Sequence, residues 1–222
     1  MNQENYAVGK SPFWMEYFEL INATKRNLVA DWFSKQTGKT WRQNKFLKSV
    51  KKALEKVDYD YAIPKIEASI DENGNIYYHK GHDVCRGLAP IEWEDKAKAF
   101  APEYQSEPGT IYELYLWYAW RIAMGYWSLE YVCDDSSGDG NYDNSPDATH
   151  DIEPSGAKNV GGAADGVGNT FKAVYDDAGY VLCGGNCHIG GMVDPVAATN
   201  WYGASHDKNS YAAWVLVLRK PF

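Results

Sequence analysis

The positions of the apolar residues divide the chain into a helical first part and a second part that mixes helices and strands. Apolar residues recur at helical spacing between residues 11 and 37 and again between residues 40 and 57, and Gly38 ends the first stretch. The side chains expected to face inward are Phe13, Trp14, Tyr17, Phe18, Ile21, Leu28, Val29, Trp32 and Phe33 in the first stretch, and Trp41, Leu47, Val50, Leu54 and Val57 in the second. The sequence therefore predicts a helical N-terminal region over residues 1–62.

The second part begins with alternating apolar residues around Asn73-Gly74, which predict a β-hairpin over residues 65–79. Thr110 and Glu113 have the spacing of a capping box. The helix that follows is apolar nearly all round as far as Gly125, so we expect it to be buried. A shorter helix is expected over residues 128–132, and strands over residues 171–175, 180–182 and 214–218. These elements predict an α+β fold in which residues 63–222 form one domain.

The composition supports a substantial core and a surface suited to recognition. Of the 222 residues 45% are hydrophobic, and the chain has 17 tyrosines and 9 tryptophans, which are common in protein interfaces. The net charge of −8 disfavours a nucleic-acid partner, because such a protein needs a basic face. No apolar run approaches the roughly 20 residues of a membrane span, and no secretory signal is visible. We expect neither membrane insertion nor secretion.

One side of the predicted helix over residues 40–57 is basic. It carries Arg42, Lys45, Lys48, Lys51, Lys52 and Lys56. Such a stripe is a candidate surface for nucleic acid or for a protein partner. It is also the ordinary pattern of a solvated helix face, which is the interpretation that the sequence alone favours.

Two stretches contain residue types that bind metal ions. His79, His82, Asp83 and Cys85 are close enough in sequence for a metal site, but alternation along a strand would place them on both faces. Residues 133–169 form a Gly- and Asp-rich insert. Its acidic residues include Asp134, Asp135, Asp139, Asp143, Asp147 and Asp151. Their spacing does not match a calcium-binding loop, so we predict no cofactor and keep Ca²⁺ as the alternative.

Several features of the second part occur in an order known from one fold. They are the helix over residues 111–124, the short helix over 128–132, the insert, and the ending with VLCGGN, Trp201-Tyr202 and AAWVLVL. With these features, residues 91–222 resemble the C-type lectin fold, in the branch shared by formylglycine-generating enzymes and the variable proteins of diversity-generating retroelements. The resemblance implies that a strand leading to Gly184-Gly185, an exposed segment and a final strand form a ligand-binding face.

Within that branch the chain is more similar to the variable proteins, which implies a variable region over about residues 183–213. In that family, adenine-directed mutagenesis changes Asn codons to those of many residue types, but not to Glu, Gln, Lys, Met or Trp. Between Cys183 and Ala213 neither Glu nor Gln occurs, and the other unreachable types appear only as Met192, Trp201 and Lys208. The expected ligand-binding residues are Asn186, His188, Gly190, Asn200, Tyr202, Gly203, His206, Asp207, Asn209 and Tyr211, with Trp201 and Trp214 in the scaffold.

This resemblance predicts a non-enzymatic adhesin that recognises a protein or cell-surface ligand. Its expected setting is a virion, or the host-cell cytoplasm before assembly, and an oligomer is compatible with it. One alternative is a copper oxidase of the formylglycine-generating type, which uses a cysteine pair in this region. Here Cys183 and Cys187 straddle the glycines, and on a straight strand they would lie about 13 Å apart. Cys187 also stands where the variable proteins more often have an aromatic residue. Another alternative is a structural virion component without a variable face.

Overall fold

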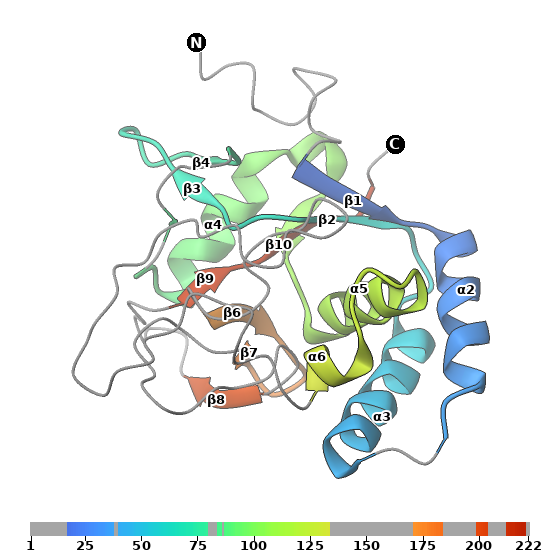
Figure 1. The fold of residues 1–222 in the computed structure, drawn as a ribbon. Helices are drawn as coiled ribbons and strands as arrows, with labels where there is room; N and C mark the ends of the chain where they lie inside the picture. Colours follow the sequence, from blue (N-terminus) through green and yellow to red (C-terminus); the bar gives the residue numbers. More distant parts are fainter. Residues whose placement is uncertain are drawn as a thin grey trace.

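The computed structural model describes residues 17–37, 40–79, 84–85, 87–133, 171–183, 199–203 and 212–220, with the backbone alone for Phe171, residues 199–203 and Ala212. Helices and strands occur together (Figure 1), so the predicted mixture of α and β structure is confirmed. The helices are α2 (Ala23–Ser34), α3 (Trp41–Lys56), α4 (Pro90–Phe100), α5 (Ile111–Ala123) and α6 (Leu129–Cys133), with a 3₁₀ turn over Pro102–Tyr104. The strands are β1 (Phe18–Ile21), β2 (Tyr61–Pro64), β3 (Ser69–Ile70), β4 (Ile76–Tyr77), β5 (Ser106–Pro108), β6 (Phe171–Tyr175), β7 (Tyr180–Cys183), β8 (Thr199–Gly203), β9 (Ala212–Trp214) and β10 (Leu216–Leu218).

The described strands form two four-stranded sheets and one short hairpin. The first sheet has the order β1-β2-β10-β5 and is antiparallel throughout. The second sheet has the order β8-β7-β6-β9, and in it β6 and β9 run parallel. β3 and β4 pair as the hairpin. Since β10 lies between β2 and β5, the first sheet joins strands from widely separated parts of the sequence.

The apolar run over residues 214–218 is divided between the two sheets. The prediction of one continuous strand is therefore wrong at Val215, where the chain leaves β9 and enters β10. The amide of Val215 donates to the carbonyl of Ala173 at 3.1 Å, and its carbonyl accepts from the amide of Gly109 at 2.8 Å. A Cβ atom on Gly109 would lie 3.1 Å from Cγ1 of Val215, so a glycine suits this close approach. Val215 thus connects the two sheets covalently and by hydrogen bonds.

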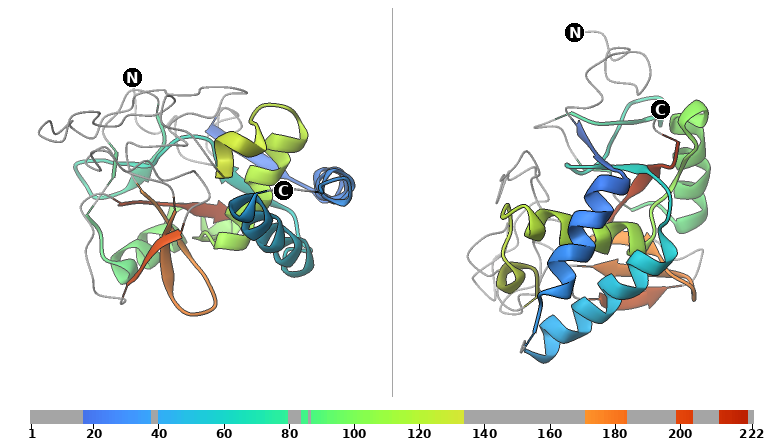
Figure 2. Two further views of the ribbon diagram at one scale, coloured as in Figure 1. Left: turned by 60° about the horizontal axis from the view of Figure 1, so that its bottom comes forward. Right: turned by 90° about the vertical axis from the view of Figure 1, so that its right-hand side faces the viewer.

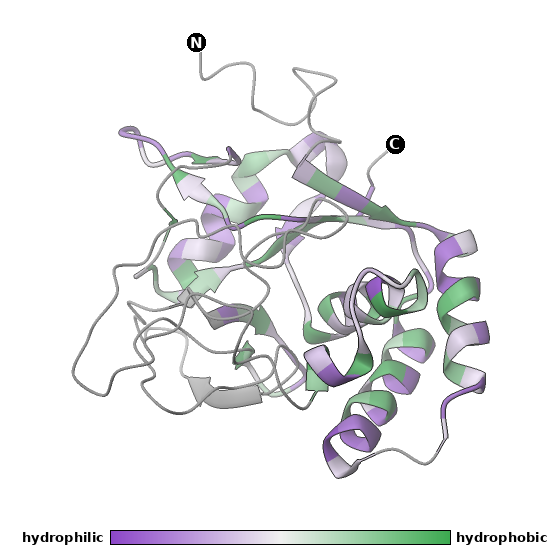
Figure 3. Ribbon diagram, in the orientation of Figure 1, coloured by the Kyte–Doolittle hydropathy of each residue, from purple (hydrophilic) through white to green (hydrophobic). Residues whose placement is uncertain are grey.

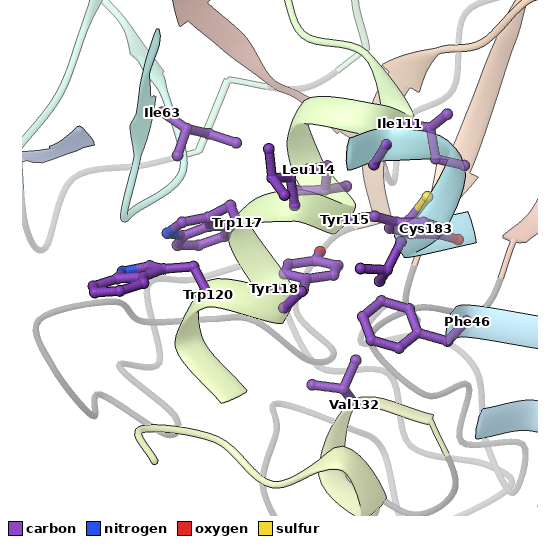
Figure 4. Packing of buried hydrophobic residues seen from close by; sticks show 14 of the residues in the cluster. Phe46, Ile63, Ile111, Leu114, Tyr115, Trp117, Tyr118, Trp120, Val132 and Cys183 are labelled. Carbon is purple, nitrogen blue, oxygen red and sulfur yellow. The ribbon is translucent and has the colours of Figure 1, made fainter. Parts of the chain in front are cut away.

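Helix α5 lies at the centre of the main core. Every one of its residues except Tyr112 and Ala123 is buried, as its apolar sequence predicts. Figure 4 shows its side chains Leu114, Tyr115 and Tyr118 among residues from α3, α6 and β7. Helices α2 and α3 pack against α5 and form one side of the molecule (Figure 2, right). A second core cluster includes Trp93 of α4 and residues of both sheets.

Three expectations for the N-terminal region are wrong. Leu28, which was expected to face inward, is 44% exposed. Phe18 and Ile21 belong to a strand, β1, because this segment pairs with β2. Helix α2 begins only after Asn22, which is extended (φ −103°, ψ 178°) and accepts from the amide of Lys25 at 3.0 Å. Trp41 is 70% exposed. It lies nine residues, or about two and a half helical turns, from the buried Val50, so it points away from the core.

Most other local predictions are confirmed. Helix α3 begins after Thr40 with a capping box, and α5 begins after Thr110 with another. The helix before Gly125 ends there, where this glycine has a φ of +73°. The hairpin, the short helix and the strand over residues 171–175 are present, although β3 and β4 are shorter than predicted. The boundary placed between residues 62 and 63 lies inside β2.

Candidate functional site

The second sheet brings the ends of the predicted variable region together. β7 ends at Cys183, which pairs with Thr199 at the start of β8. β9 begins at Ala212, which pairs with Phe171 at the start of β6, and this start lies beside the end of β7. Both ends of the segment 184–198 therefore lie at one end of the second sheet. The C-terminal ends of the undescribed segments 134–170 and 204–211 lie at this same end.

The predicted ligand-binding residues divide into two groups. Asn200, Tyr202 and Gly203 lie on β8, at an edge of the second sheet, where Tyr202 pairs with Val181 and Gly203 pairs with Tyr180. The pairing of β7 with β8 shifts register beside Asn200. The remaining predicted residues lie outside the described part of the chain; they are Asn186, His188, Gly190, His206, Asp207, Asn209 and Tyr211.

Two of the strands next to these segments, β7 and β9, are held by buried side chains. All four residues of β7 are buried. Trp214, predicted to belong to the scaffold, is 4% exposed, and its ring lies 5.2 Å from that of Tyr180 and 6.3 Å from that of Trp93. Its indole Nε1 donates to the carbonyl of Leu88 at 3.1 Å. The chain thus leaves β7 and enters β9 at backbone positions that buried side chains hold in place.

A buried ion pair that sequence reasoning missed lies at the same end of the sheet. Lys172 of β6 pairs with Glu67, and their side chains are only 12% and 4% exposed. Both residues line a cavity of about 30 Å³, which is otherwise mainly apolar and includes Leu114 and Trp214 in its wall. This volume has room for about one or two water molecules. The cavity is therefore too small to be a ligand pocket, and recognition here would use the surface above the sheet.

The thiol of Cys183 is poorly suited to cysteine chemistry. It is fully buried, and burial raises its pKa to about 12, although a hydrogen bond with Tyr115 acts in the opposite direction. A thiol reacts or binds copper as the thiolate, which such burial disfavours at neutral pH. Cys187, its proposed partner, lies outside the described residues. The other described cysteines, Cys85 and Cys133, are also buried and not in disulfides.

The two metal candidates receive no support from the described residues. Cys85 is buried, and burial raises its pKa to about 11. His79 lies with its ring centroid 6.5 Å from that of Tyr17, whereas His82 and Asp83 fall outside the description. All the acidic residues named in the insert also fall outside the description. Within the described ranges no three His, Cys, Asp or Glu side chains gather as a metal site.

Comparison with protein-family models, with curated proteins and with solved structures finds no match for this chain. None of the described helices is both long and apolar enough to span a membrane.

Proposed function

We propose that this protein is a ligand-binding protein with a C-type lectin-like domain, and that residues 184–211 form its binding face. In this proposal it is a variable protein of a diversity-generating retroelement, carried on a virion as a receptor-recognising adhesin. It binds a protein or cell-surface ligand non-covalently and performs no catalysis. No cofactor takes part in this binding.

The observation that carries the proposal is the meeting of the segment ends at one end of the second sheet. Strands β7, β8 and β9 provide those ends, and buried side chains fix β7 and β9. Side chains between fixed ends can change without disturbing the core, which is the requirement for a diversified binding surface. The restricted residue types between Cys183 and Ala213 agree with this requirement.

The burial of Cys183 makes the oxidase alternative less favourable. That chemistry needs a thiolate that a copper ion or substrate can reach, and the sulfur of Cys183 lies in the core beside Tyr115. The alternative of a structural virion component can be distinguished from the proposal by measurement. A diversified binding face must tolerate substitutions at its residues, whereas a structural component need not.

The proposal is tested with two libraries of the full chain. In the first, Asn186, His188, Asn200, Tyr202 and Asn209 are randomised to the residue types that Asn codons can reach. In the second, the same number of frame positions is randomised. We expect most members of the first library to unfold cooperatively, within about 1 kcal/mol of the parent for exposed positions. Selection of that library against a panel of purified proteins should also yield binders.

The frame library is the matched control. Its positions are Ala173, Val174, Val181, Leu182 and Trp214, all buried. We expect few of its members to fold. If the two libraries lose folding equally, or if the single change Tyr202→Ala unfolds the protein, residues 184–211 are part of the core and the proposal fails. A further check is genomic: an adenine-rich near-copy of the coding sequence for this region, beside a reverse-transcriptase gene.

A further inference from the structure

The exposed fraction of Trp41 is far larger than that of any other tryptophan whose side chain is described. Its residue is 70% exposed, whereas Trp93, Trp117, Trp120, Trp127 and Trp214 are all at 5% or less. It occupies the first position of α3, with the guanidinium carbon of Arg42 6.0 Å from its ring centroid. A large exposed aromatic side chain is common at the centre of protein interfaces.

Four lysines extend from Trp41 along the same side of α3. Lys45, Lys48, Lys52 and Lys56 follow it at spacings of three or four residues, so that they lie on one stripe. This stripe is opposite the buried side of the helix, which carries Phe46, Leu47, Val50 and Ala53. We call Trp41 and these four lysines the α3 face. Figure 3 shows strongly hydrophilic stretches along this helix, on the side of the molecule formed by α2 and α3.

One end of the α3 face already binds a carboxylate. Asp177, in the turn between β6 and β7, accepts hydrogen bonds from Lys56 at 2.6 Å and from Lys52 at 3.0 Å. The hydroxyl of Tyr112 donates to the same carboxylate at 2.8 Å. Hydrogen bonds from Lys56, Tyr112 and Lys52 hold the pKa of Asp177 below its ordinary value. The arrangement shows how a pair of lysines on this helix receives an acidic side chain.

The other end of the face has no such partner among the described residues. Lys45 and Lys48 are exposed, and no described carboxylate forms an ion pair with either of them. They lie on the same stripe one to two turns earlier and are three residues apart, whereas Lys52 and Lys56, which hold Asp177, are four residues apart. An acidic residue presented by another chain would find the same chemistry there, next to the exposed ring of Trp41.

We propose that the α3 face is a docking site for an acidic segment of another protein, which places carboxylates on Lys45 and Lys48 and an apolar side chain on Trp41. We favour an acidic protein segment over nucleic acid because the lysines at the other end of the face already hold a carboxylate, that of Asp177. The site lies on α3, whereas the proposed ligand-binding face belongs to residues 184–211. The α3 face therefore gives the protein an attachment surface separate from its recognition surface. This docking proposal does not depend on the proposed function.

The test measures binding of two fluorescein-labelled peptides to the full chain at low salt. One peptide is a 20-residue poly-L-glutamate, and in the other every fourth Glu is replaced by Leu. We expect both to bind, the second more tightly, with affinities that fall as salt rises. The double change Lys45→Glu with Lys48→Glu should weaken both by at least about tenfold. Trp41→Ala should weaken the Leu-containing peptide and leave poly-L-glutamate within about twofold.

The matched control is the double change Lys35→Glu with Lys220→Glu, which alters the net charge equally at two exposed lysines outside the α3 face. It should change neither affinity by more than about twofold. An equal loss in this control overturns the proposal, as does an absence of peptide binding. Tighter binding of a 20-nucleotide single-stranded DNA than of either peptide also overturns it. So does a dimer, seen by light scattering, that the Lys45 and Lys48 changes dissolve. Urea unfolding of each variant confirms that it is folded.

Discussion

Replacing Glu113 with glutamine should destabilise the protein far more than the loss of a helix cap does. The side chain of Glu113 is 0% exposed, and its two oxygens accept five hydrogen bonds. Oε1 accepts from the hydroxyl of Tyr59 and from Nε of Arg219, both at 2.8 Å. Oε2 accepts from the amide of Thr110 at 2.8 Å, from its hydroxyl at 2.9 Å and from Nη2 of Arg219 at 3.3 Å.

Glutamine has the same shape as glutamate, but one of its two terminal groups donates instead of accepting. If the amide nitrogen takes the place of Oε1, it faces Nε of Arg219. If it takes the place of Oε2, it faces the amide of Thr110. Neither of these groups can accept, so one donor is left without a partner in either orientation, and the ion pair is lost as well. Removing one partner of a buried pair costs about 3–5 kcal/mol, and since Arg219 is 30% exposed we expect about 2–4 kcal/mol.

The measurement is urea unfolding followed by tryptophan fluorescence, with Glu92→Gln as the control. Glu92 occupies the equivalent capping position of α4, where it accepts from the amide of Ala89 at 2.8 Å, and it is only partly buried. We expect its replacement to cost about 1 kcal/mol or less. A double-mutant cycle with Arg219→Gln should give a coupling energy of about 1 kcal/mol or more. Equal effects of the two Glu→Gln changes, or strict additivity in the cycle, would refute this reasoning.

Three further outcomes are expected. Trp214→Ala should cost about 3–5 kcal/mol in urea unfolding, because it removes a ring packed between both sheets and α4; a cost under about 1 kcal/mol would show that the ring is not part of the core. For Glu19, burial raises the pKa, but hydrogen bonds from two indoles and the charges of a lysine and an arginine outweigh it, so the pKa lies below the ordinary 4.5. The stabilisation that ionised Glu19 contributes to the folded state is therefore complete above about pH 4.5 and is lost as the pH falls through the lowered pKa. The difference in free energy of unfolding between the parent and Glu19→Gln should thus shrink from about pH 7 to about pH 3. A difference that stays constant contradicts the assignment. A chromogenic thiol reagent should leave Cys85, Cys133 and Cys183 unmodified in the folded protein and modify them in urea, and rapid native modification of any of them contradicts its burial.

The parts of the fold that could be predicted are those determined by residues close in sequence. Thr110 accepts from the amide of Glu113 three residues later, so a short motif was enough to place the start of α5. Thr40 caps α3 in the same way, although the start of α3 was predicted from apolar spacing alone. The hairpin turn is similarly local, because Asp71 accepts from the amides of Asn73 and Asn75.

The errors concern contacts between distant residues. The spacing of Phe18 and Ile21 fits a helix, and only the pairing of Ile21 with Tyr61 determines that the segment is a strand. Likewise, nothing in an apolar pentapeptide indicates that Val215 changes sheets, since the partners are Ala173 and Gly109. Tertiary pairing overrides local periodicity in both places.

The candidate site shows the same division. The resemblance to the lectin-like family led to the prediction of a binding face in residues 184–211, but the meeting of the segment ends depends on how β6, β7, β8 and β9 pair. The Glu67–Lys172 pair spans 105 positions, and no spacing rule connects two such residues. For Trp41, a helical wheel centred on Val50 would have placed it outside, so the signal was present in the sequence and was misread.

The passage of the chain through Val215 has a consequence for protein synthesis. A premature stop codon or a frameshift between residues 184 and 211 would remove β9 and β10, and with β10 the strand that joins β2 to β5 in the first sheet. Such truncated products would lack the centre of a sheet and not merely a terminal strand, so they should be degraded instead of accumulating. If mutagenesis acts on this region, only variants that keep the reading frame to the end of β10 can therefore complete the first sheet and fold.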